Sequence, residues 1–188
     1  PQRSLSNNSI CYTEKPDMGA FMREWLAIYE SRSGERGIFN REACKDMIPE
    51  RRDPNYEFGC NPCSEVVLRS SGLCNLSEVV LRPQDTIDDV YRKVRLATIL
   101  GTYQSTLTDF RYVRPIWKRN AEEERLLGVS FTGVFDCPAI LHATPEELGD
   151  LKLHAVEQNK LWAKKLGINQ SVAVTCIKPS GTVSQLVD

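Results

Sequence analysis

The sequence predicts an α/β fold in which short strands alternate with long helices. Helical periodicity is visible at residues 18–29 and 85–103, and again in a stretch that begins at Thr144. Short runs rich in valine, isoleucine and other apolar residues lie between these helices and lack polar alternation. Strands that are apolar on both faces are typical of a sheet covered by helices, so we expect a layered α/β architecture.

The first two helices are predicted from apolar residues that recur on one face. These are Phe21, Met22, Trp25, Ile28 and Tyr29 in the first helix, and Ile87, Val90, Tyr91, Val94 and Ala97 in the second. Asp17 precedes the first helix and belongs to a residue type that caps helix N-termini. We expect both apolar faces to be core.

The third helix carries signals at both of its ends. Thr144 is a candidate cap, Pro145 suits the first helical position, and Glu147 completes a capping box. Gly167 predicts the end of this helix, because glycine readily adopts the left-handed conformation found there.

Four short runs are predicted to be strands: residues 64–68, 75–81, 128–134 and 171–177. The first two lie close together in the sequence, so a hairpin between them is an alternative to two separate places in a sheet.

Composition places the chain among ordinary globular proteins. It has 188 residues, of which 41% are hydrophobic and 26% are charged, so it can bury one sizeable core. The net charge of −1 gives no basic surface for nucleic acid. The apolar runs are short and broken by charge, so we expect neither a membrane span nor a secretory leader.

Seven cysteines, an odd number, argue against a secreted disulfide framework. We therefore expect a cytoplasmic protein with reduced thiols. The chain opens on Pro1 and stops at Asp188 within an apparent helix start, so we interpret residues 1–188 as a single partial domain, an internal piece of a longer polypeptide.

Cys60 and Cys63 have the spacing of a zinc half-site. A structural zinc site needs two further ligands, and the only histidines, His142 and His154, are distant in the sequence. A thioredoxin-type pair is also disfavoured, because such a pair begins a helix whereas this one precedes a predicted strand. A non-catalytic thiol or zinc module on these two cysteines therefore stays an alternative of lower rank.

Asn61, Cys63 and Glu65 suggest a reactive site instead. If this stretch is extended, side chains two residues apart point the same way, so an amide, a thiol and a carboxylate share one face. Buried polar groups need partners, and the hydroxyl groups of a substrate can supply them.

Five segments of the chain resemble the catalytic chain of ribonucleotide reductases, most closely the class II, adenosylcobalamin-dependent type. They are "NPCSE", "CNLSEVVLRP", "RLATILGTYQSTLTDFRYVR", "EEERLLGVSFTG" and "AVTCIKPSGTVSQL", in the order of the family. The resemblance implies that the chain is part of a ten-stranded α/β barrel, with a central finger loop that carries the radical cysteine. It also implies reduction of ribonucleotides to 2′-deoxyribonucleotides, which supplies DNA precursors.

The resemblance assigns roles to the residues of the "NPCSE" segment. Cys63 is implied to be the thiyl radical site that removes the 3′ hydrogen of the ribose, and Glu65 the general base on the 3′ hydroxyl. Asn61 is implied to hold the ribose hydroxyls in the reacting geometry. Cys74 is implied to be half of the dithiol that donates two electrons, with its partner thiol outside this chain.

The segment "KPSGTVSQL" contains a small-residue turn between a predicted strand and a predicted helix start. Backbone N–H groups at such a turn can bind an anion, although the signal is weak by itself. The resemblance implies that this turn, Pro179, Ser180, Gly181 and Thr182, holds the phosphate groups of the substrate.

The implied cofactor is adenosylcobalamin, a cobalt corrinoid, and no metal is expected to bind the protein directly. The implied partners are the ribonucleotide substrate, a nucleotide effector and a thioredoxin-like dithiol reductant. "NPC", in place of the "NLC" common in class I enzymes, favours class II. The large subunit of a class I ribonucleoside-diphosphate reductase stays the first alternative.

Overall fold

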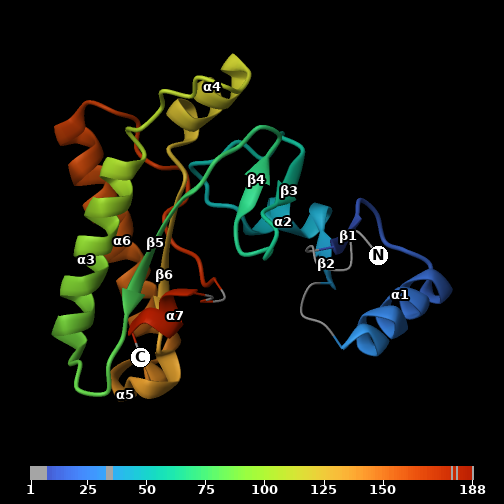
Figure 1. Ribbon diagram of the computed structural model, residues 1–188, viewed down its shortest axis with the longest axis horizontal. Coiled ribbons are helices and arrows are strands. Elements are labelled where there is room, and N and C mark those ends of the chain that lie inside the picture. The colour runs from blue at the N-terminus through green and yellow to red at the C-terminus, as the bar shows by residue number, and fades with distance from the viewer. Residues whose placement is uncertain (1–7, 33–35, 179, 181, 188) are drawn as a thin grey trace. The chain divides into compact units, whose positions relative to one another are not determined.

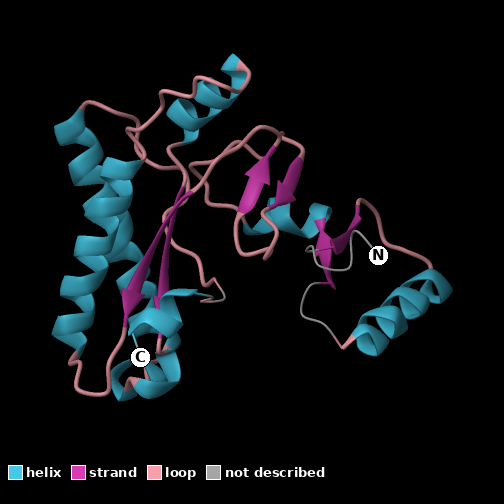
Figure 2. Cartoon of the chain, viewed as in Figure 1, coloured by secondary structure: helices cyan, strands magenta, loops and turns pink. Residues whose placement is uncertain are grey.

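The computed structural model describes residues 8–32, 36–178, 180 and 182–187. The chain divides between Ser70 and Ser71 into two compact units. Both units combine helices with short strands, so the α/β class predicted from the sequence is confirmed (Figure 2). The prediction of one partial domain stays a prediction, since two compact units can belong to the same domain.

The first unit contains two separate pairs of strands (Figure 1). Its elements are β1 (Asn8–Tyr12), α1 (Met18–Ser31), β2 (Arg36–Asn40), α2 (Arg41–Met47), β3 (Phe58–Cys60) and β4 (Val67–Arg69). β1 and β2 are parallel, whereas β3 and β4 form an antiparallel hairpin.

Helix α1 begins where the sequence predicted, and the carboxylate of Asp17 caps it by accepting hydrogen bonds from the backbone N–H groups of Gly19 and Ala20. Its apolar face, however, is not core. No residue of α1 is buried, and Trp25 is 55% exposed. The expectation was wrong here because the two-stranded β1–β2 sheet, which α1 contacts, is too small to cover the helix.

The second unit is larger and holds the main hydrophobic core. Its elements are β5 (Asn75–Val80), α3 (Ile87–Gln104), α4 (Pro115–Glu124), β6 (Leu127–Thr132), a 3-10 turn η1 (Val134–Asp136), α5 (Pro138–Leu141), α6 (Pro145–Leu166) and α7 (Thr182–Val187). Strands β5 and β6 are parallel, and helices α3 and α6 lie alongside them (Figure 1).

Capping explains where the two long helices begin. The predicted box at Thr144 and Glu147 is present, and α6 ends at Gly167 with φ 66° as expected. Helix α3 begins at Ile87, two residues later than the predicted Asp85, because Thr86 and Asp89 form a second capping box. Both boxes satisfy N–H groups that would otherwise lack partners at the helix start.

The hydrophobic core lies between the β5–β6 sheet and the helices α3 and α6. The fully or nearly fully buried members are Val79, Leu81, Val90, Val94, Leu127, Val129, Cys137, Ile140, Leu151, Ala155 and Val174. Strand β6 ends at Thr132 because Gly133 has φ 77°, and a Cβ at that position would lie 2.7 Å from the carbonyl oxygen of Leu81.

Two strand predictions need correction. Residues 64–66 are not strand, and β4 pairs with β3 while β5 pairs with β6, so the alternative hairpin between 64–68 and 75–81 is wrong. Residues 171–177 lie beside β6 but form only one bridge, between Val129 and Thr175.

The irregularity at 171–177 has a cause in the hydrogen-bond register. The N–H groups of Leu127 and Val129 donate to the carbonyls of Ala173 and Val174. This segment therefore advances by one residue where β6 advances by two, which interrupts a regular ladder in the manner of a bulge.

Candidate functional site

The residues Asn61, Cys63 and Glu65 lie in the turn that connects β3 and β4. The N–H of Asn61 donates to the carbonyl of Val66 at 3.2 Å, and the N–H of Ser64 donates to the carbonyl of Asn61 at 2.9 Å. The N–H of Val66 donates to Oδ1 of Asn61 at 3.0 Å. The three residues are therefore brought together by a turn, and the expectation of one extended face is wrong.

The local sequence accounts for the turn. Pro62 fixes its own φ at a value suited to the second position of a β-turn, and Ser64 adopts the left-handed conformation with φ 64°. An extended strand tolerates neither feature well.

Charged and aromatic side chains support the hairpin below the turn. Phe58 is 1% exposed, and the guanidinium of Arg52 lies 4.7 Å from the centre of its ring. Arg52 also donates to the carbonyl of Val67 at 2.6 Å, and Arg69 stacks over Tyr56 at 4.5 Å. These contacts hold the strands on which the turn is built.

The three side chains differ in their surroundings. The Cys63 side chain is exposed at the tip of the hairpin, whereas Glu65 is half-buried. Oε2 of Glu65 is buried and accepts no hydrogen bond within the described residues. A buried carboxylate oxygen without a donor calls for an explanation, and a ligand hydroxyl is one. Oδ1 of Asn61 already accepts a hydrogen bond within the turn, so only the amide N–H groups of Asn61 can donate to a ligand.

The structure does not add ligands to the Cys60–Cys63 pair. Sγ of Cys60 lies 3.4 Å from Oγ of Ser64. In the described part of the chain, no group of three or more histidine, cysteine or acidic side chains is placed to hold a metal ion. No disulfide joins any of the seven cysteines, all of which lie in described segments.

Cys74 and the turn at 179–182 belong to the second unit. Cys74 directly precedes β5 and is half-buried. Oγ of Ser180 accepts a hydrogen bond from the N–H of Ser184 at 3.1 Å, and Oγ of Ser184 donates to the carbonyl of Ser180 at 3.0 Å. Ser180 therefore supports the first turn of α7 and keeps its own hydroxyl hydrogen as a donor. Pro179, Gly181 and the side chain of Thr182 lie outside the described residues.

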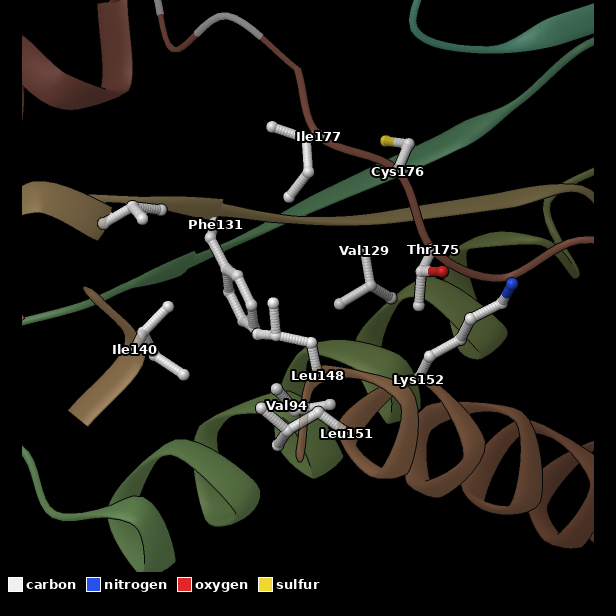
Figure 3. Close-up of a pocket in the computed structure, with 11 residues that line it drawn as sticks. Val94, Val129, Phe131, Ile140, Leu148, Leu151, Lys152, Thr175, Cys176 and Ile177 are labelled. Atoms are coloured by element: carbon white, nitrogen blue, oxygen red, sulfur yellow. The ribbon is translucent and has the colours of Figure 1, made fainter. Parts of the chain in front are cut away.

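An apolar cavity of about 440 Å³ lies in the second unit, and neither Cys74 nor Ser180 lines it (Figure 3). Val94, Val129, Phe131 and Leu151 line it, and Lys152 lies at one end. The cavity lies between the core face of β6 and helices α3 and α6, so its lining is largely the core itself.

Sequence reasoning missed two polar residues of the second unit, Glu78 and Lys178. Glu78 is 93% buried within a strand that reads as apolar, and Nζ of Lys178 lies 3.8 Å from its Oε2. Glu78 could have been singled out from the sequence, because it stands between "LS" and "VVL" and a charged residue in the middle of a buried strand is unusual.

No helix in the described part of the chain combines the length and the apolar composition that crossing a bilayer requires.

Comparisons with known proteins agree on one family of relatives. No family model matches the chain. The adenosylcobalamin-dependent ribonucleoside-triphosphate reductase of Lacticaseibacillus paracasei is 27% identical over an alignment of 221 residues, which covers 98% of this chain and 28% of the relative. A probable enzyme of the same name from Dictyostelium discoideum is 28% identical, with coverage of 99% and 25%.

A solved structure has a similar fold. The crystal structure of a B-12-dependent (class II) ribonucleotide reductase matches with a TM-score of 0.61 and 22% identity, covering 96% of this chain and 29% of that one. The chain thus spans little more than a quarter of the length of its relatives. It is a distant homologue of one segment of the adenosylcobalamin-dependent ribonucleoside-triphosphate reductases.

Proposed function

We propose that the chain is the central catalytic segment of an adenosylcobalamin-dependent ribonucleotide reductase. In this proposal its strands form part of a ten-stranded α/β barrel, and the turn at 61–66 is the tip of the central finger loop. The enzyme reduces ribonucleotides to 2′-deoxyribonucleotides and so supplies DNA precursors in the cytoplasm. The distant homology over nearly the whole chain supports this reading.

Cys63 carries the radical in this proposal. Its exposure at the hairpin tip fits the role, because both the radical source and the substrate must reach the sulfur. Adenosylcobalamin, when bound, would supply the carbon radical that converts the thiol to a thiyl. We assign none of the described residues to holding the corrinoid. The Cys63 thiyl then takes the 3′ hydrogen of the ribose and returns it at the end of the reaction.

Glu65 and Asn61 prepare the ribose for loss of its 2′ hydroxyl. The buried Oε2 of Glu65, which has no donor among the described residues, accepts the proton of the 3′ hydroxyl while a thiol of the reducing pair protonates the 2′ hydroxyl, which leaves as water. Glu65 then returns its proton to the 3′ oxygen. The Asn61 amide donates to a ribose hydroxyl from a position fixed by its bond to Val66.

Cys74 supplies reducing power together with a second thiol outside this chain. The two thiols give up two electrons and two protons and become a disulfide, which balances the replacement of a C–OH by a C–H bond. A thioredoxin-like dithiol then reduces the disulfide by exchange. A nucleotide effector selects the substrate from outside the segment.

The turn at 179–182 receives the phosphate groups of the substrate. Two observations support this role: Ser180 retains a hydroxyl donor, and the segment leads directly into α7.

The observation that carries the proposal is the hairpin turn itself, which presents an exposed thiol two residues from a buried carboxylate oxygen that no described residue donates to. The test is an assay of the full-length polypeptide that carries these residues, with a dithiol and without a second subunit. We expect ribonucleotide reduction only when adenosylcobalamin is added.

Activity that appears only with a separate radical-generating protein would move the chain to class I. The roles of Asn61, Cys63 and Glu65 would then stand, but the cofactor assignment would be wrong.

A further inference from the structure

Glu78, in the middle of β5, is a buried acid that the proposed function does not use. Its side chain is 7% exposed, and neither carboxylate oxygen accepts a hydrogen bond within the described residues. Burying a charge in this way is costly unless an opposite charge compensates it.

The compensating charge is Lys178. Its Nζ lies 3.8 Å from Oε2 of Glu78, beyond hydrogen-bond distance, so the attraction is mainly ionic. The Lys178 side chain is 23% exposed, so solvent screens this ion pair only in part.

Lys178 is also held through its backbone. Its N–H donates to Oγ of Ser130 at 3.0 Å, and Ser130 is 1% exposed. Ser130 is the direct cross-strand partner of Glu78 in the β5–β6 pair. Two neighbouring strand residues therefore fix one lysine, one through its side chain and the other through its main chain.

Glu78 and Ser130 project from the face of the sheet opposite helices α3 and α6. Oγ of Ser77 donates to the carbonyl of Ala97 in α3, and Val129 points toward the helices in Figure 3. Because successive side chains of a strand alternate, the next residues, Glu78 and Ser130, point the other way. Lys178 is therefore anchored on the face of the sheet opposite α3 and α6.

Lys178 lies immediately before the segment 179–182, so its anchoring bears on that segment. Lys178 directly precedes Pro179, which has no N–H, so the Lys178 N–H is the last main-chain donor before Ser180. Fixing Lys178 fixes the point at which the turn at 179–182 begins.

We propose that Glu78, acting through Lys178, is a positioning residue for the turn at 179–182, and that Ser130 assists it. The inference rests on the proposed function, in which this turn receives the phosphate groups of the substrate.

A change of charge at Glu78 and a loss of positioning predict opposite changes in ligand affinity, which makes the inference testable. Glu78→Gln leaves the Lys178 charge without its counter-ion, so a purely electrostatic contribution would strengthen the binding of a polyanion. Loss of positioning weakens that binding instead. The sign of the change in affinity therefore separates the two.

The experiment uses the full-length polypeptide and measures calorimetric binding of a ribonucleoside triphosphate and of inorganic tripolyphosphate, together with KM and kcat. For Glu78→Gln we expect about tenfold weaker binding of both ligands, since small misplacements of a binding group carry penalties of this order. KM should rise with little change in kcat. The double variant Glu78→Asp/Lys178→Arg, in which a longer cation meets a shorter acid, should recover most of the affinity.

The matched control is Glu157→Gln, which makes the same change of charge on the exposed face of α6 and should leave both affinities unchanged. If Glu78→Gln does not fold, the double variant Glu78→Gln/Lys178→Met removes both charges and should show the same loss of affinity.

Unchanged or tighter binding in the folded Glu78 variant would overturn the inference and leave the proposed function intact. Wild-type protein that binds triphosphate without reducing it would refute the proposed chemistry, and the variant comparison would still decide the inference. A wild-type protein that binds neither ligand would overturn the inference together with the assigned role of the turn.

Discussion

Asn61 is the residue that shapes the candidate site. Its backbone carbonyl and its side-chain oxygen both accept hydrogen bonds from within the turn, from Ser64 and Val66. The turn in consequence leaves Cys63 exposed while Glu65 is half-buried. A substitution at Asn61 would disturb the turn as well as any contact with a ribose, so it cannot by itself separate structure from catalysis.

The variant Cys63→Ser separates a structural role from a catalytic role better than a substitution at Asn61. Serine is similar in size, and the Cys63 side chain is exposed, so the hairpin should fold as before. An O–H bond is too strong to yield its hydrogen to a carbon radical, so we expect ribonucleotide reduction by the full-length protein to fall to background while nucleotide binding is unchanged. Activity assays and calorimetry check the two halves of this prediction. Loss of binding along with activity would mean that Cys63 is structural.

Cys74→Ser should have a milder effect. The radical step does not need this thiol, but the two-electron reduction does, so we expect at most a single turnover per active site. Rapid-quench measurement of product against enzyme concentration tests this, with Cys176→Ser in the same unit as the control that keeps multiple turnover. Normal multiple turnover by Cys74→Ser would exclude its role as the reductant.

Among the elements, the two long helices α3 and α6 are the most strongly specified. Each begins with a complete capping box, and together they cover the core face of β5 and β6. Helix α1 has an equally good cap but no buried residue. Local signals therefore predict that a helix forms, whereas packing depends on the size of the sheet against it.

The capping box of α3 gives a pH dependence. Hydrogen bonds from the Thr86 side chain and backbone, and then from Arg92, hold the pKa of Asp89 below its usual value. A carboxyl whose pKa is lowered on folding adds stability above its unfolded pKa, about 3.9, and loses it as pH falls through the lower folded value.

We therefore expect urea unfolding of the wild-type chain to show a loss of stability below about pH 4 that is smaller in Asp89→Asn. The matched control is Asp88→Asn, which removes a first-turn acid that is not part of the capping box. An Asp89→Asn chain whose stability falls with pH as steeply as that of the wild type would contradict the assignment.

At the scale of the whole molecule, the described strands form three sheets of only two regular strands each. Such pairs leave edges without partners and cover little of the helices against them. The chain also spans only about 28% of the bacterial relative and 25% of the amoebal one. In the proposed function, catalysis also needs the remaining strands of the barrel and the second thiol.

We accordingly expect residues 1–188 alone to give no detectable turnover with adenosylcobalamin and a dithiol, while the full-length polypeptide is active under the same conditions. A radiolabelled nucleotide assay on both proteins, at equal concentration, makes the comparison. Turnover by the 188-residue chain would show that neither an outside thiol nor a closed barrel is needed.

Helix positions were predictable from sequence because they depend on contacts between residues three or four apart. The caps at Asp17 and Thr144, and the end at Gly167, were all identified in this way. Residues 171–177 were not, because their register against β6 depends on a partner strand more than forty residues away. Ion pairs such as Glu78 with Lys178 escape sequence reasoning for the same reason.

The hexapeptide "SEVVLR" occurs twice, at residues 64–69 and 77–82. In the first copy Ser64, Glu65 and Val66 complete a turn, and the remaining residues pair antiparallel with β3. In the second copy Ser77 to Val80 lie in β5, parallel to β6. The sequence by itself determined the helices α1, α3 and α6, the α/β class and the family resemblance that assigns a role to Cys63. Only the tertiary structure decided which copy turns and which stays extended, because the partner strand and the Asn61 side chain, rather than the six residues, supply the hydrogen bonds.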